Sequence, residues 1–126
     1  MRTLWIEYGQ VRLCARCLEA GADWLVLVSG GDSPHVGALS LADPAEAPGV
    51  GQLPPGRSLS YARHREAELT EPLAAGLAQG LGRKVVVAAG LHWDNFSPEL
   101  LAQVHAAWQE LAGRLLAELG GAAARR

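Results

Sequence analysis

Apolar and polar residues alternate along the first part of the chain, which is the pattern of β-strands that bury one face. The alternation runs over residues 3–8 and again over residues 11–17. Gly9-Gln10 separates the two runs, and a glycine at the first position of a two-residue loop is typical of a β-hairpin. The sequence therefore predicts an N-terminal hairpin, and four residues of its second strand share one face: Val11, Leu13, Ala15 and Cys17.

Two later segments are apolar without interruption, which predicts central strands covered on both faces. They are WLVLVS at residues 24–29 and KVVVAAGL at residues 84–91. Between them, VGALSLA at residues 36–42 predicts a further strand.

Residues 42–57 are rich in proline and glycine, which predicts a loop rather than a folded element. A loop of this length could serve as the gate of a binding site. The segment SLSY at residues 58–61 then predicts a short strand, with Leu59 and Tyr61 facing inward.

Leucines at four-residue steps predict a first helix that ends at Gly80 and Gly82. Its beginning is open, because Pro72 lacks a backbone donor and disfavours helical geometry in the residue before it. Either Thr70 caps the helix, or the helix begins near Arg65 and kinks at the proline. The leucines of the ridge are Leu69, Leu73, Leu77 and Leu81.

A second helix begins at Ser97-Pro98-Glu99, which combines a capping hydroxyl, a proline at the first helical position and an acid in the first turn. Gly120 is expected to end it, and residues 121–126 to form a frayed tail. The long apolar stripe of this helix could continue across a subunit boundary, so we expect a homodimer. The stripe consists of Leu101, Val104, Trp108, Leu111, Leu115 and Leu119.

The order of these elements is four or five strands, a helix, a strand and a helix. It predicts an α+β fold in which a mostly antiparallel sheet of five to six strands packs against both helices. A chain of 126 residues is long enough for one such domain, which we place at residues 1–120.

Composition narrows the class of protein. The formal net charge is −2, so the chain has no overall basic field for nucleic acid. No apolar run reaches the roughly 18 residues that would cross a bilayer, so we expect no membrane span. The N-terminal residues alternate between polar and apolar, so we also expect no signal peptide, and we expect a cytoplasmic location.

Cys14 and Cys17 have CxxC spacing but fall on a predicted strand, where residues three apart point to opposite faces. We therefore expect two half-buried thiols rather than a redox or metal pair.

Polar residues follow each of the two apolar strands. If those strands are parallel neighbours, both clusters lie at the same end of the sheet, where ligands commonly bind. A third cluster, His64 and Arg65, precedes the first helix and could close the site. The first two clusters are Gly30, Gly31, Asp32, Ser33 and His35, and His92, Asp94 and Asn95.

These residues suit a phosphorylated, partly aromatic ligand. The two glycines allow an anion-binding nest of backbone amides, and Trp93 or Phe96 offers a stacking surface. The alternative is structural: the first cluster is a plain turn, and the second leads into a helix cap. A divalent metal is a further possibility, although the histidines and aspartates lack HxH or HExxH spacing.

The blocks SGGDSPHVGALSLA, PGRSLSYARHRE and VVVAAGLHWDN, in this order, resemble the LpdD-like prenylated-flavin chaperone domain over roughly residues 3–118. The resemblance implies a proteasome-assembly-chaperone-like fold, usually dimeric, with no catalytic chemistry of its own. It implies binding of prenylated FMN and help in its delivery to a UbiD-type decarboxylase, and involvement of a flavin prenyltransferase is conceivable. The middle block departs from the family pattern, which leaves the role of Arg57 and the register of His64 open.

Three functions therefore follow from the sequence. The first is a prenylated-FMN carrier that uses the ten cluster residues above. The second is a protein-binding assembly factor without a small-molecule ligand, and the third is a small metal-assisted enzyme that uses His35 and His92.

Overall fold

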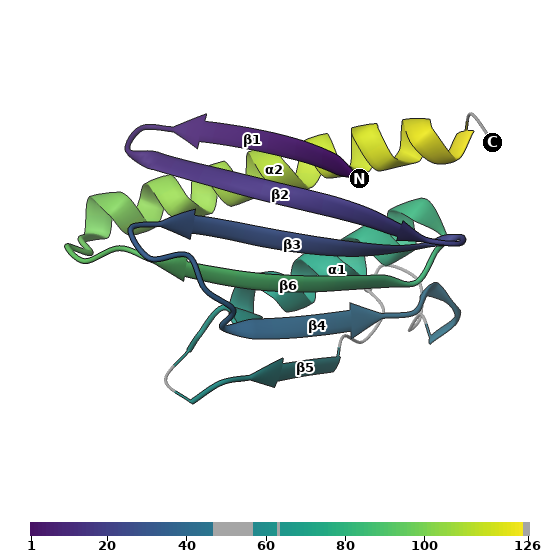
Figure 1. Cartoon of the computed structure of the whole chain (residues 1–126), viewed down its shortest axis with the longest axis horizontal. Coiled ribbons are helices and arrows are strands. Elements are labelled where there is room, and N and C mark those ends of the chain that lie inside the picture. Colours follow the sequence, from purple (N-terminus) through teal and green to yellow (C-terminus); the bar gives the residue numbers. More distant parts are fainter. Residues whose placement is uncertain (47–56, 63, 125–126) are drawn as a thin grey trace.

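Six strands form one mixed sheet in the order β1-β2-β3-β6-β4-β5 (Figure 1). The computed structural model describes residues 1–46, 57–62 and 64–124. Neighbouring strands are antiparallel except β3 and β6, which run parallel. This confirms the predicted α+β fold and its order of elements. The strands are β1 (Arg2–Tyr8), β2 (Val11–Ala20), β3 (Asp23–Gly31), β4 (Ala38–Ala42), β5 (Arg57–Ser60) and β6 (Val85–His92).

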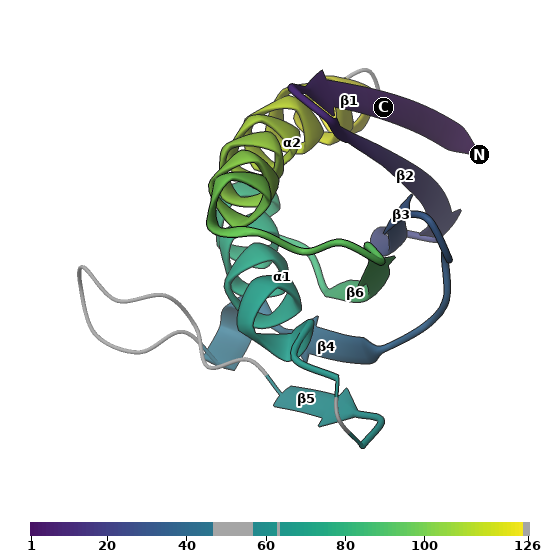
Figure 2. The same cartoon turned by 90° about the vertical axis from the view of Figure 1, so that its left-hand side faces the viewer.

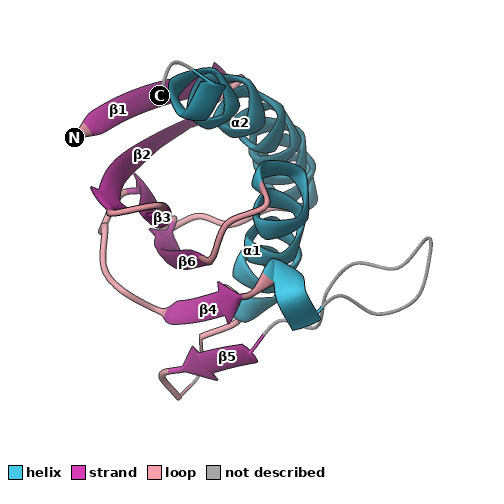
Figure 3. Ribbon diagram, turned by 90° about the vertical axis from the view of Figure 1, so that its right-hand side faces the viewer, coloured by secondary structure: helices cyan, strands magenta, loops and turns pink. Residues whose placement is uncertain are grey.

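Both helices, α1 (Ala67–Leu81) and α2 (Pro98–Ala124), lie on the same face of the curved sheet (Figures 2 and 3). α2 contacts β1 and β2, whereas α1 contacts β4, β5 and β6, and the helices contact each other. The core lies between the helices and this face. Neither helix, over the residues described, combines the length and apolar character needed to cross a membrane.

The N-terminal hairpin follows the predicted pattern. Gly9 has φ 57°, which a glycine adopts without strain, and β1 pairs with β2 from Tyr8↔Val11 onward. Cys14 and Cys17 are buried free thiols on strand β2, three residues apart and therefore on opposite faces. Both thiols are free, but the expectation that they are half-buried is wrong, because Cys14 and Cys17 are 3% and 0% exposed.

The other face of the sheet is not covered by helices, which corrects the prediction that the two apolar strands are buried on both faces (Figure 2). Leu25 on β3 is 42% exposed, and its neighbour Val86 on β6 is only partly buried. A continuous apolar run does not distinguish a covered face from an apolar surface. We call this surface the uncovered face; its apolar residues are Trp5, Cys14, Leu18, Leu25, Leu27, Leu39, Leu41, Leu59, Val86 and Ala88.

Strand β5 forms where expected, but the inward orientation of Leu59 and Tyr61 is wrong. Both side chains are about two-thirds exposed or more, at 73% and 67%. β5 is an edge strand, and Leu59 pairs with Leu39 on the uncovered face. Before β5, a short 3₁₀ helix spans Pro44–Glu46. Residues 47–56, where the gate loop was expected, lie outside the described residues.

α1 begins at Ala67 with Glu66 at the N-cap position, and Pro72 lies inside the helix. The second of the two predicted beginnings, near residue 65, is therefore confirmed. Gly80 lies within the helix, and Gly82 ends it in a left-handed conformation with φ 65°.

A chain of hydroxyl groups fixes the first turn of α1 against the sheet. The buried Thr70 lies 2.7 Å from Ser40 of β4, and Ser40 lies 2.6 Å from Ser58 of β5. The Ser58 hydroxyl in turn donates to Glu71 at 3.1 Å. These contacts hold the start of α1, which follows residues 64–66, against β4 and β5.

α2 differs from the prediction at both ends. Leu100, not Leu101, faces the core, since Leu100 is 5% exposed and Leu101 is 44% exposed. The helix continues beyond Gly120 to Ala124, because glycine weakens a helix without forcing its end, and Leu119 is fully buried in the last turns. Apart from Leu101, the apolar stripe of α2 is buried within the chain and is not left for a second copy, which removes the reason for placing a dimer contact there.

Candidate functional site

The first two polar clusters lie side by side at one end of the sheet. They follow β3 and β6, which are parallel neighbours with Gly31 opposite His92. The Asp32 amide donates to the His92 carbonyl at 2.7 Å, and the Asp94 amide donates to the Asp32 carboxylate at 2.9 Å. The predicted juxtaposition is therefore present, and Asp32 holds the two turns together.

This arrangement changes the role of the glycine pair. Gly31 has φ 91°, and a Cβ at this position would overlap the His92 carbonyl. The glycine is thus needed for the close approach of β6. The Asp32 amide donates to that same carbonyl and is therefore not free to bind an anion. The main role of this turn is thus to hold the end of β3 against the end of β6.

His92 and Asp94 form an exposed pair, with His92 Nε2 3.1 Å from Asp94 Oδ1. His35 turns away from this pair toward the third cluster, where its ring contacts His64 and Glu66. The Ser33 carbonyl lies 3.0 Å from His35 Nδ1. Ser33 and Asn95 do not line the two cavities at this end of the described part of the chain.

The third cluster joins the first at the start of β4 and the end of β5. The Tyr61 amide donates to the Gly37 carbonyl at 2.9 Å, which brings the chain after β5 against the chain before β4. His64 Nδ1 then lies 3.1 Å from His35 Nε2, with ring centroids 4.8 Å apart. Glu66 faces both rings: its Oε1 lies 3.4 Å from His35 Nε2, and its Oε2 lies 3.4 Å from His64 Nδ1.

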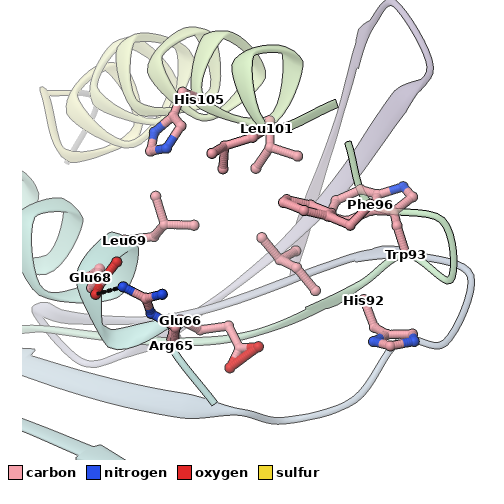
Figure 4. Close-up of a pocket in the computed structure, with 11 residues that line it drawn as sticks. Arg65, Glu66, Glu68, Leu69, His92, Trp93, Phe96, Leu101 and His105 are labelled. Atoms are coloured by element: carbon pink, nitrogen blue, oxygen red, sulfur yellow. Dashed lines mark hydrogen bonds and ion pairs between the residues drawn. The ribbon is translucent and has the colours of Figure 1, made fainter. Parts of the chain in front are cut away.

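A cavity of about 430 Å³ lies between the start of α1, the end of β6 and the start of α2 (Figure 4). Leu69 of α1 and Leu101 of α2 point into it, and Trp93 and Phe96 lie at one end with ring centroids 6.3 Å apart. We call it the helix cavity. Its polar residues are Arg65, Glu66, Glu68, His92 and His105.

Arg65 lies on the rim of the helix cavity, paired with Glu68 at 3.0 Å. Both side chains are more than two-thirds exposed, so this pair stabilises little and the guanidinium can exchange partners. Arg57 starts β5 and lies three residues before Ser60, which pairs with the start of β4 near the clusters. It lines neither cavity of the described chain.

A second hollow, of about 410 Å³, lies on the uncovered face beside the end of β3. Arg12 lines it, with its guanidinium 4.2 Å from the centre of the Trp5 ring and 3.4 Å from Glu7. Trp93 borders both spaces. The predicted residues Gly30, Gly31 and Asp32 line this hollow, whereas Arg65 and His92 line the helix cavity, so the ten predicted residues do not surround a single space.

Sequence reasoning missed Glu66 and His105. Glu66 stands two residues after His64 in the segment HRE, where it reads as part of a charged helix start. His105 is exposed, as its position on the helix predicts, and its role in lining the cavity depends on how α2 packs beside α1.

The family model for the prenylated flavin chaperone LpdD-like domain matches residues 7–120, which include all three clusters and both cavities except Trp5. The chain belongs to this family. A search of curated proteins finds no match. This match confirms the resemblance of the three sequence blocks to the family. The family is described as a prenylated flavin chaperone domain.

The helix cavity of this LpdD-like domain fits the chemistry of a prenylated flavin. Its volume lies in the range of small-molecule sites, which is about 300–1,000 Å³. Two aromatic rings and several leucines match a flat ring system with an apolar prenyl group. Arg65, His92 and His105 offer donors to a phosphate.

Proposed function

We propose that this LpdD-like domain binds prenylated FMN in the helix cavity and delivers it to a UbiD-type decarboxylase in the cytoplasm, without catalysing a reaction itself. The observation that carries the proposal is the combination, in one cavity, of an aromatic end with hydrogen-bond donors from Arg65, His92 and His105. When bound, prenylated FMN supplies the cofactor chemistry of the decarboxylase; the domain supplies only its binding site.

The residues of the cavity divide by chemistry. Trp93 and Phe96 contact the ring system, since apolar aromatic faces favour stacking. Arg65 contacts the phosphate after leaving Glu68, because a charge-assisted bond to a dianion is stronger than an exposed surface pair. Phe96 is 55% exposed, so it can also be displaced when the cofactor is released.

Titration with purified prenylated FMN, followed by tryptophan fluorescence, tests this site. The Arg65→Gln variant is expected to raise Kd roughly tenfold, or about 1.4 kcal/mol. Arg16→Gln is the matched control, because Arg16 lines the hollow on the uncovered face. Equal loss of affinity in both variants, or a loss only in Arg16→Gln, would place the cofactor elsewhere.

Delivery needs a separate test. The loaded domain is mixed with apo-decarboxylase, the two proteins are separated by size, and the cofactor in each fraction is measured by absorbance. Transfer at a rate above that of free cofactor supports delivery. Retention by the domain contradicts delivery but leaves binding intact. Adding a flavin prenyltransferase to the same assay tests whether it is also a partner.

A protein-binding assembly factor is the second candidate, and the uncovered face favours it. Leu18, Leu25, Val86 and Leu41 lie opposite one another across four adjacent strands, which forms an apolar row on the surface. Such rows mark protein interfaces. We propose that this face, rather than the α2 stripe, forms the homodimer contact.

A further inference from the structure

Three side chains from two separate segments converge at the start of β4. His35 precedes β4, while His64 and Glu66 precede α1. His35 Nε2 and His64 Nδ1 are 3.1 Å apart, and Glu66 Oε1 lies 3.4 Å from the first and 3.5 Å from the second. The three atoms form a nearly equilateral triangle.

The edges of this triangle match a tetrahedral metal site. With metal–ligand bonds of about 2.0–2.1 Å, as for Zn²⁺, two ligand atoms of a tetrahedron lie about 3.3 Å apart. The observed separations of 3.1, 3.4 and 3.5 Å therefore fit three ligands on one face of a tetrahedron.

Glu66 provides an independent sign that the site takes a cation. Its side chain is only 10% exposed, and Oε2 has no hydrogen-bond partner among the described residues. Glu66 stands at the N-cap of α1 but makes no side-chain cap, since its carboxylate faces the histidines. A buried carboxylate oxygen without a hydrogen bond is costly, so a positive charge between these groups would stabilise it.

His35 is oriented as a ligand. A carbonyl oxygen only accepts, so the 3.0 Å contact with Ser33 requires a proton on His35 Nδ1. In the neutral ring this leaves the lone pair on Nε2, which faces the other two groups. A backbone carbonyl that fixes the second ring nitrogen is the usual support of a metal-bound histidine.

Glycines make room for this arrangement. A Cβ on Gly37 would overlap the Glu66 carboxylate, and a Cβ on Gly90 would overlap the His35 carbonyl. Both glycines belong to the sequence blocks that carry the family resemblance. The positions of Glu66 and His35 are therefore built into the chain by residues without side chains.

We propose that His35 Nε2, His64 Nδ1 and the Glu66 carboxylate bind one divalent transition-metal ion of the zinc class. Two imidazoles and one carboxylate are ligands that Zn²⁺ accepts in tetrahedral sites. The fourth position is left for water or another oxygen donor, and Glu66 also lines the helix cavity, from which such a donor can approach. His92, which the sequence grouped with His35 as a metal ligand, is not part of this site.

Zinc binding to the purified, metal-stripped chain tests the proposal, measured with a competing chromophoric chelator. One Zn²⁺ per chain is expected. Removing a supporting group around a metal costs roughly 10–100-fold in affinity, and removing a ligand, as in Glu66→Gln or His64→Ala, should cost at least as much. The matched control is His92→Ala, because His92 and Asp94 are also an imidazole–carboxylate pair but have no third ligand.

Co²⁺ gives a second readout. Bound in place of zinc, it should give the intense visible absorption of a tetrahedral site, and this absorption should be absent in His64→Ala. His64 is 33% exposed, so this variant keeps the core intact, and circular dichroism checks its fold. Failure of the unmodified chain to bind Zn²⁺ would overturn the proposal and leave a shared proton between the rings. Equal affinity in wild type and His64→Ala, or loss in His92→Ala alone, would also overturn it.

Discussion

Close backbone contacts explain the glycine at position 90. Its α-carbon faces the His35 carbonyl, and an added methyl group would overlap that carbonyl and the following amide. Backbone atoms cannot move aside as a flexible side chain can. The segment that carries His35 is therefore positioned by the absence of a side chain on β6.

Gly90→Ala is expected to destabilise the protein by about 1–3 kcal/mol, the usual cost of overpacking. Denaturant unfolding measures this change. Gly76→Ala is the control, since Gly76 lies inside α1 with no atom within 4 Å of its added methyl group, and it should stabilise by roughly 0.5–1 kcal/mol. Two equal and small effects would contradict the packing argument.

The Cys17 thiol gives a pH dependence. Burial raises its pKa from 9.0 to about 11, with smaller effects from Arg2 and Cys14. Between about pH 9 and 11 the unfolded thiol loses its proton while the folded thiol keeps it, so the native state binds more protons and its stability falls as pH rises.

Unfolding free energies measured at intervals from pH 8 to 11 should show this fall for the wild type. Cys17→Ala should reduce it, whereas Cys14→Ala, which retains Cys17, should not. An unchanged pH dependence in Cys17→Ala would show that another group is responsible.

At the scale of elements, periodicity predicted most of the fold. Alternation located the hairpin, and leucine spacing located both helices. The errors concern features that depend on packing between distant segments. These are which leucine of α2 faces the core, whether Leu59 points inward, and whether the strands have one covered face or two. The sequence of one element does not contain this information.

Leu100 and Leu101 offer a direct check of the helix phase. Leu100→Ala should cost about 2–5 kcal/mol because its side chain is buried in the core. Leu101→Ala should cost much less, since Leu101 is 44% exposed and lines the helix cavity. Thermal unfolding of both variants measures the loss of stability in each. A larger loss in Leu101→Ala than in Leu100→Ala would contradict the packing of α2.

The candidate site was predictable only in part, because packing between distant segments also decides which side chains meet there. Two clusters after parallel strands must meet at one edge, and they do. The partner of His35 and His64 was not predictable, because Glu66 reaches them only through the packing of α1 against β4 and β5. The ten predicted residues consequently fall in three neighbouring places instead of one pocket.

At the scale of the whole molecule, a sheet with helices on one side leaves an apolar surface on the other. We expect self-association through this surface. Leu25→Glu, at a position 42% exposed, should shift the protein toward monomer in sedimentation experiments without unfolding it. Leu116→Glu, on α2 and 38% exposed, should leave association unchanged. A wild-type chain that remains monomeric at high concentration would contradict this arrangement.

The central claim is that the helix cavity holds prenylated FMN. The most direct measurement is the mass of the small molecule released from the protein after co-expression with a flavin prenyltransferase, compared for the wild type, Phe96→Ala and the exposed aromatic control Tyr8→Ala. The account predicts the mass of prenylated FMN in the wild type and Tyr8→Ala, and its loss in folded Phe96→Ala. A wild-type protein that carries no cofactor, or full retention in Phe96→Ala with loss in Tyr8→Ala, would contradict it.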